Sequence, residues 1–217
     1  MRGYTSKEKL SYHTDFCDVV CLFVLRIAQS GGLSIVGSSI AIHNEIARQR
    51  PDLLEVLYQP YYYSWQGQEV PGEAPYYKLP IFSEHAGKFA CIYVRSHILS
   101  AQRFPEVPRL TEKQLEAIDL YDALAASEAF SFSTLFLPGD LQIINNYVLF
   151  HSRTAFEDHP ESERRRHLLR LWLAVANSRA LSPGLSPIFG SGRPGVLRGG
   201  FPSRTGQHVY ETMESVT

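Results

Sequence analysis

Residues 13–34, HTDFCDVVCLFVLRIAQSGGLS, decide the fold that the sequence predicts. The segment 17–28 is rich in β-branched and aromatic residues and ends before Gly31-Gly32, a pattern typical of a buried strand. His13, Thr14 and Asp15 stand directly before it. On a strand, side chains two residues apart point the same way, so we expect His13 and Asp15 on one face and Thr14 on the other.

Other segments repeat this β pattern. Strands are expected at residues 89–98, 132–137, 141–144, 147–151 and 166–175. Helices are expected only midway, after a cap at Ser38 or Ser39, from Pro51, and behind the capping box Thr111–Gln114. Residues 58–77, rich in Tyr, Pro and Gly, are interpreted as a long loop of the kind that often forms a lid. Because β segments dominate and no βαβ alternation is present, the sequence predicts a mostly-β (α+β) jelly-roll barrel with inserted helices.

The bulk composition limits the class of protein. Of the 217 residues, 44% are hydrophobic and 20% are charged, which fits one domain over residues 1–176 with residues 177–217 as a surface wrap or partly disordered tail. The net charge of −1 gives no reason to expect nucleic acid or an anionic membrane as a partner. Three cysteines, a polar N-terminus and the lack of a long apolar run predict a cytoplasmic location.

A candidate metal site joins His13 and Asp15 to His151, which ends the strand predicted at 147–151. Two histidines and one carboxylate form the facial ligand set of non-haem iron oxygenases, which leaves the opposite face of the metal open. The alternative interpretation is a surface His13 and a buried, hydrogen-bonded His151.

Arg166 and Arg170 are four residues apart, so on a strand they share a face. Guanidinium groups inside a barrel are costly unless they meet carboxylates, and a dicarboxylate ligand would supply such a partner. The alternative is a solvated basic edge, since residues 164–166 are all arginine. Arg170 lies within an apolar run and therefore needs a buried partner.

Five motifs together resemble the TauD/TfdA family of iron(II)- and 2-oxoglutarate-dependent dioxygenases, which includes relatives of taurine dioxygenase and clavaminate synthase. The resemblance covers about residues 10–175 in the right order. The motifs are His13-Thr14-Asp15, Gly31-Gly32-Leu33-Ser34, Pro138-Gly139-Asp140, Asn146 with His151-Ser152-Arg153, and residues 166–172 (RHLLRLW).

The resemblance implies a role for each matching residue. His13, Asp15 and His151 match the iron ligands. Ser34 stands where the family has a threonine whose hydroxyl holds a 2-oxoglutarate carboxylate. Arg166 matches the arginine that pairs with that carboxylate, and Arg170 a second arginine facing substrate or co-substrate, although which of the two binds 2-oxoglutarate stays open.

The implied activity is oxidation, usually hydroxylation, of a small organic substrate by Fe(II), 2-oxoglutarate and O2, with release of succinate and CO2. Only twelve residues precede His13, whereas family members normally carry a substantial segment there. We therefore expect a catalytic portion that lacks the usual N-terminal segment and exposes apolar surface or a strand edge, which a partner chain or a homo-oligomer would cover.

Two rival functions remain: a truncated, non-catalytic relative that acts as a binding or interaction module, and a zinc hydrolase on a similar barrel. Other local patterns are given less weight. Residues 190–195 (GSGRPG) resemble a dinucleotide motif but follow no βαβ unit. Cys17 and Cys21 fit small buried residues better than zinc ligands. Residues 61–63 and Trp65 either line a lid or pack on the barrel.

Overall fold

A computed structural model of the chain describes residues 6–201. Its strands are β1 (Leu10–His13), β2 (Val19–Arg26), β3 (Ser30–Gly31), β4 (Ser34–Ser38), β5 (Pro60–Ser64), β6 (Tyr76–Pro80), β7 (Phe82–His85), β8 (Lys88–Cys91), β9 (Ser131–Thr134), β10 (Leu141–Asn145), β11 (Leu149–Arg153), β12 (Phe156–Glu157) and β13 (His167–Leu173). Its α-helices are α1 (Ser39–Gln49), α2 (Pro51–Leu57), α3 (Arg95–Ala101), α4 (Glu112–Ala125) and α5 (Ser186–Phe189), and short 3-10 turns lie at Ser162–Arg164 and Pro183–Leu185.

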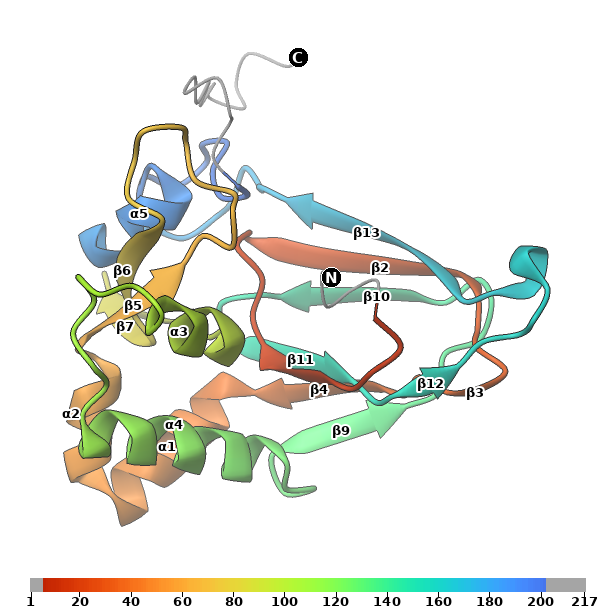
Figure 1. Ribbon diagram of the computed structural model, residues 1–217, viewed down its shortest axis with the longest axis horizontal. Coiled ribbons are helices and arrows are strands. Elements are labelled where there is room, and N and C mark those ends of the chain that lie inside the picture. Colours follow the sequence, from red (N-terminus) through yellow and green to blue (C-terminus); the bar gives the residue numbers. More distant parts are fainter. Residues whose placement is uncertain (1–5, 202–217) are drawn as a thin grey trace.

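Two antiparallel sheets form the barrel. The four-stranded sheet has the order β1-β11-β4-β9 and the three-stranded sheet the order β10-β2-β13. Figure 1 shows one sheet above the other, with the helices gathered at one end of the sandwich. The jelly-roll prediction is confirmed, and the space between the sheets receives side chains from both.

The helices α1, α2 and α4 begin where the sequence predicts. The Ser38 hydroxyl accepts a hydrogen bond from the Ala41 amide, Pro51 opens α2, and Thr111 forms a complete capping box with Gln114. These helices pack with β5–β8 into the main core, whose largest fully buried side chains include Tyr61, Tyr63, Tyr93, Tyr121 and Phe150.

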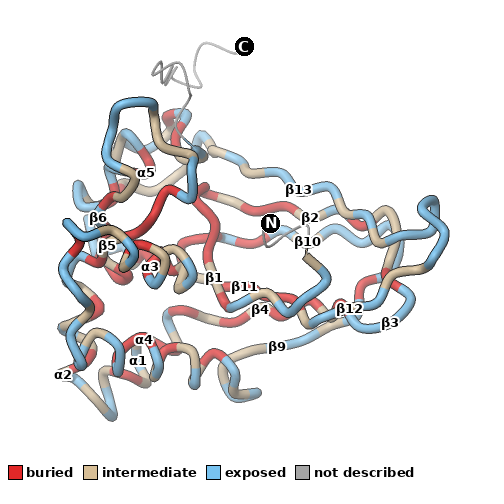
Figure 2. Tube along the Cα trace, in the orientation of Figure 1, coloured by how far each residue is buried: buried red, intermediate tan, exposed pale blue. Residues whose placement is uncertain are grey.

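The two faces of strand β2 differ in burial, although Cys21 on the outer face is itself buried. Val20 and Val24 point between the sheets and are fully buried, whereas Phe23 points outward and is 38% exposed. Outward residues of the neighbouring strands are also apolar and exposed: Leu141, Ile143, Leu169, Leu171 and Leu173. Figure 2 shows the resulting exposed stretches along β13. Within residues 6–201, this three-stranded sheet therefore presents an apolar outer face to solvent.

Two local predictions were wrong. Residues 58–77 are not a long loop, because β5 and β6 pair as a hairpin in register Tyr61↔Leu79 and Tyr63↔Tyr77. Tyr61 and Tyr63 alternate into the core, so the packing interpretation holds for them and the lid interpretation does not. The strand predicted at 89–98 ends at Cys91, and α3 follows from Arg95, because the chain turns there to bring Val94 into a β-bridge with His13.

Residues 177–201 lie against the rest of the molecule. Leu181, Leu185, Ile188 and Phe189 join the main core. Arg198, buried, forms an ion pair of 2.9 Å with buried Asp18. No helix in the described part of the chain is long and apolar enough to cross a membrane.

Candidate metal centre

The two histidines of the candidate site meet across neighbouring strands. β1 pairs with β11 in a register that sets His13 opposite His151. Opposed side chains on one face of an antiparallel pair lie close together, and the two imidazole centroids are 4.3 Å apart. Pairing of β1 with β11 thus joins residues 138 positions apart in the sequence.

Asp15 lies just beyond the end of β1, yet its carboxylate faces His13 and Thr14 points the other way, which is the arrangement expected from the sequence. Backbone and side-chain hydrogen bonds hold this arrangement. Thr14 is turned away and exchanges hydrogen bonds with the Tyr93 backbone, the Tyr93 amide donating to Thr14 Oγ1 at 2.8 Å. Buried Asn146 accepts from the Asp15 amide at 2.8 Å and donates to the Asp15 carbonyl at 2.6 Å. The turn after β10 therefore fixes the backbone that carries Asp15.

The three side chains converge on one point. His13 Nε2 lies 4.0 Å from Asp15 Oδ1, and His151 Nε2 lies 3.7 Å from Asp15 Oδ2. All ligand atoms of the three residues lie within 4.8 Å of one another. Ligands bound at about 2.1 Å to one metal lie at most about 4.2 Å apart, so small side-chain rotations would let all three bind one ion. The donor set therefore fits a metal of the iron or zinc kind.

Both imidazoles are prepared for metal binding. His13 Nδ1 lies 2.7 Å from the Ser11 carbonyl, which fixes the proton on Nδ1 and leaves the Nε2 lone pair facing Asp15. Burial, reinforced by neighbouring His13, lowers the pKa of His151 to about 3. His151 is therefore neutral near pH 7, which is the form that binds metals.

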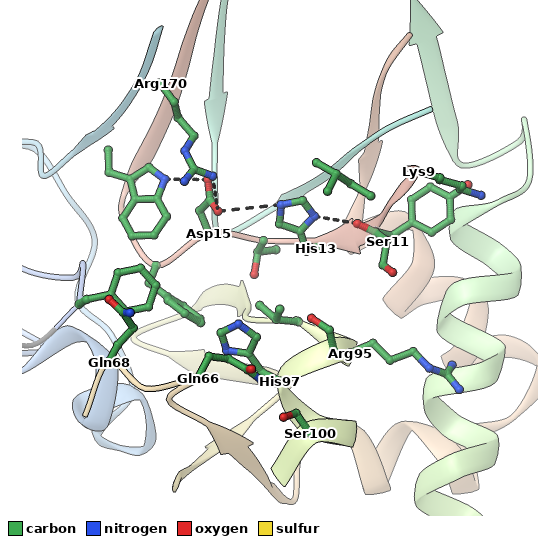
Figure 3. A pocket seen from close by; sticks show the side chains of 18 residues that line it. Lys9, Ser11, His13, Asp15, Gln66, Gln68, Arg95, His97, Ser100 and Arg170 are labelled. Carbon is green, nitrogen blue, oxygen red and sulfur yellow. Dashed lines mark hydrogen bonds and ion pairs between the residues drawn. The ribbon is translucent and has the colours of Figure 1, made fainter. Parts of the chain in front are cut away.

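The Asp15 carboxylate also receives donors from β13. Trp172 Nε1 donates to Oδ2 at 2.7 Å, and Arg170 lies 3.5 Å from Oδ1. Figure 3 shows Asp15 between Arg170 and His13, with dashed lines to both. Arg170 thus has the acidic partner that the sequence required, and this partner is the predicted carboxylate ligand itself.

A cavity of about 660 Å³ is lined by His13 and Asp15. Polar side chains that line it include Lys9, Gln66, Gln68, His97, Ser100 and Arg170. Figure 3 places His97, Gln66 and Ser100 on the wall opposite His13. The sequence pattern does not predict this wall, because His97 lacks ligand spacing and only the fold brings α3 and the β5–β6 connection to the site. Arg95 lines the cavity, but its guanidinium binds Asp119 and Asp122 on α4.

Comparison with known proteins identifies the family. The model of the "Taurine catabolism dioxygenase TauD, TfdA family" matches residues 2–172. The chain belongs to the TauD/TfdA family. FR-33289 synthase from Streptomyces rubellomurinus is 32% identical over 194 residues, which are 86% of this chain and 56% of that protein. Taurine hydroxylase-like protein SAT17 from Stachybotrys chartarum is 32% identical over 182 residues, which are 82% of this chain and 46% of that protein. The chain thus spans about half the length of these curated relatives.

Solved structures of the same fold include two oxygenases. Asparagine oxygenase in complex with Fe(II), 2S,3S-3-hydroxyasparagine and succinate gives a TM-score of 0.58 at 21% identity, covering 79% of this chain and 51% of that chain. The non-heme iron oxygenase OrfP, in complex with Fe and alpha-ketoglutaric acid, gives 0.56 at 18% identity, covering 77% and 50%. At these identities the likeness supports the jelly-roll fold.

The residues expected to hold 2-oxoglutarate in this TauD/TfdA chain lie on the inner side of the barrel. Ser34 is buried on β4, in register with Arg153 and two residues before Val36, the partner of His151. Arg166 packs beside Gly32, since a Cβ on Gly32 would lie 3.5 Å from Arg166 Nε. Burial and the charge of Arg153 lower the pKa of Arg166 to about 10. Within residues 6–201, the Arg166 guanidinium has no carboxylate at ion-pair distance, so its charge is available to a bound anion.

Proposed function

We propose that this protein is an Fe(II)- and 2-oxoglutarate-dependent dioxygenase that hydroxylates a small organic substrate. The observation that carries the proposal is the convergence of His13, Asp15 and His151, the first two of which line a cavity. Three protein ligands on one side leave positions for a co-substrate and oxygen on the other. Family membership and the printed names of the relatives, a synthase and a hydroxylase-like protein, support the same reaction class.

Each residue has a defined part in this proposal. His13, Asp15 and His151 would hold Fe(II), which together with 2-oxoglutarate and O2 supplies the oxidising chemistry and yields succinate and CO2. Arg166 provides positive charge for the distal carboxylate of 2-oxoglutarate, and Ser34 adds a polar group on β4. This choice assigns Arg170 to the substrate side, because Arg170 lines the cavity and Arg166 does not.

The chain's own groups prepare the site for this reaction. Asn146 fixes the backbone of Asp15, and Trp172 orients its carboxylate. Phe16 packs edge-to-face against Trp172, with ring centroids 6.4 Å apart. These rings form an apolar wall beside the ligands that limits the access of water to the reacting centre.

The cavity suits a small polar substrate. Lys9 and Arg170 provide positive charge, while Gln66, Gln68 and Ser100 provide hydrogen-bonding groups. We infer that the substrate carries an anionic group together with further polar atoms, because a bound substrate removes water from these side chains and has to pair with them instead. The reaction at carbon is hydroxylation in this proposal.

The test is a spectroscopic titration without oxygen. Anaerobic addition of Fe(II) and 2-oxoglutarate should produce a weak visible charge-transfer band, which His13→Ala or Asp15→Ala should abolish. His85→Ala, at an exposed histidine far from the ligands in sequence, serves as the matched control and should keep the band. A folded protein that binds no iron and gives no band would refute the proposal.

Two further measurements separate the rival functions. Metal analysis after purification without chelator distinguishes iron from zinc, and zinc as the sole tightly bound metal would favour the hydrolase. Succinate formation from 2-oxoglutarate distinguishes an enzyme from a binding module: a protein that gives the band but forms no succinate with any candidate substrate is the module.

A cytoplasmic location, proposed from the sequence, is supported by cysteines that are all free and buried. A homo-oligomer stays a prediction, and sedimentation velocity would measure it.

A further inference from the structure

A glutamine lies on the inner face of β10, where the strand pattern predicts an apolar residue. Leu141 and Ile143 point outward and are 57% and 62% exposed, so Gln142 and Ile144 point between the sheets. Ile144 is buried in a small apolar cluster with Cys17 and Val20. The amide of Gln142 is therefore a polar group placed inside the barrel.

This amide is only half satisfied. Its Oε1 accepts a hydrogen bond of 2.9 Å from the Ser34 hydroxyl, which reaches across from the opposite sheet. Its Nε2 is buried and has no hydrogen-bond partner within the described part of the chain. A buried, unpaired N–H is costly, and native proteins rarely retain one unless a ligand or water completes it.

The surroundings of this N–H favour an anion. Ser34 lies two residues after Gly32, against which Arg166 packs. Arg153, in register with Ser34, donates hydrogen bonds to the backbone carbonyls of Ser6 and Thr154. Arg166 and the Gln142 amide therefore remain to serve a ligand here, and both are donors. A carboxylate is the small ligand group that such a set binds best.

We propose that Gln142 Nε2 donates a hydrogen bond directly to the distal carboxylate of 2-oxoglutarate, and that Ser34 acts as the positioning residue that aims this amide. The inference rests on the proposed function. It differs from what the family resemblance implies, because the Ser34 proton is given to Gln142 Oε1 and so is not given to the co-substrate. The Ser34 hydroxyl on β4 thus influences the co-substrate only by holding the Gln142 amide on β10 in place.

Two substitutions at one position test the donor. Gln142→Leu keeps the approximate size and removes the N–H, and Gln142→Glu keeps the shape but places a negative charge beside the carboxylate. The measurement is the dissociation constant of 2-oxoglutarate, read from the charge-transfer band of the anaerobic Fe(II) protein. We expect an increase of about 10-fold for the leucine variant and about 100-fold or more for the glutamate variant.

A second ligand shows whether the effect is at the distal carboxylate. 2-Oxobutyrate has the same 2-oxo acid end but no distal carboxylate, so its dissociation constant should stay within about 2-fold in Gln142→Leu. Ile143→Gln, on the outward face of the same strand, controls for substitution in β10 and should leave both constants unchanged. Ser34→Ala should weaken 2-oxoglutarate less than Gln142→Leu does, because it frees the amide without removing it.

Three results would overturn the inference. If folded Gln142→Leu binds 2-oxoglutarate with unchanged affinity, Gln142 does not donate to the co-substrate. If Ser34→Ala loses more 2-oxoglutarate affinity than Gln142→Leu does, Ser34 is the direct ligand. Equal weakening of both 2-oxo acids by Gln142→Leu means that Gln142 supports the fold rather than the carboxylate. Absence of any band in the wild-type protein is a different failure, since it refutes the proposed function and the inference falls with it.

Discussion

Replacing Trp172 by phenylalanine should weaken metal binding by about 10-fold. The indole Nε1 donates to Asp15 Oδ2 at 2.7 Å, and the carboxylate is almost fully buried. A hydrogen bond to a charged group is worth about 1.5–3 kcal/mol, and residues that orient a ligand typically change metal affinity by about 10- to 100-fold. Phenylalanine keeps an aromatic ring against Phe16 but cannot donate.

The direction follows from the second partner of the carboxylate. Arg170 lies 3.5 Å from Asp15 Oδ1, so loss of the indole donor leaves the guanidinium as the main attraction for the freed carboxylate. A carboxylate rotated toward Arg170 has to rotate back before it can join His13 and His151 around a metal. Part of the lost hydrogen-bond energy therefore appears as lower affinity, and we expect the lower end of the range, about 1.4 kcal/mol.

Anaerobic calorimetry with Fe(II), repeated with Mn(II) as a redox-stable substitute, measures this affinity. Trp65→Phe is the matched control, since it makes the same change at the second tryptophan, which packs on Tyr77 in the main core. Equal melting temperatures would show that both variants fold. An affinity for both metals within about 2-fold of wild type in Trp172→Phe would refute the idea that the indole orients Asp15.

Three further predictions concern stability. Asn146→Leu should lower the free energy of unfolding by about 2–4 kcal/mol in a urea titration, because it leaves backbone groups that the amide satisfies unpaired, and a loss below 1 kcal/mol would contradict this role. Arg198→Met should lower the free energy of unfolding by about 3–5 kcal/mol, because it leaves the buried charge of Asp18 unpaired. Adding Asp18→Asn should restore part of this stability. If the effects of the two substitutions simply add, the ion pair does not contribute as proposed. Burial, together with nearby His13, lowers the pKa of His97 from 6.5 to about 4. Between these two pH values, His97 is therefore protonated in the unfolded chain and neutral in the folded chain. The free energy of unfolding should then fall by about 1.5 kcal/mol from pH 6.5 to pH 5, and His97→Gln should flatten this slope.

Local signals predicted those parts of the fold that depend on neighbours in the chain. Ser38, Pro51 and Thr111 start helices through interactions within one turn, so their roles are visible in the sequence. The hairpin of β5 and β6 is not visible in the sequence pattern, because its tyrosines gain their burial from distant helices and strands. Residues 89–98 resemble a single strand in sequence, because an apolar run does not reveal where the chain must turn.

The sequence by itself determined which residues are predicted to bind the metal, since residue type, spacing and family motif point to His13, Asp15 and His151. Only the tertiary structure decided how they meet: strand pairing opposes the two histidines, and Asn146 with Trp172 holds the carboxylate after the strand has ended. The inward glutamine on β10 and the polar wall on α3 belong to the same class of information. The physical reason is that the chemistry of a side chain depends only on its residue type, whereas the distances between site residues depend on contacts between segments far apart in the chain.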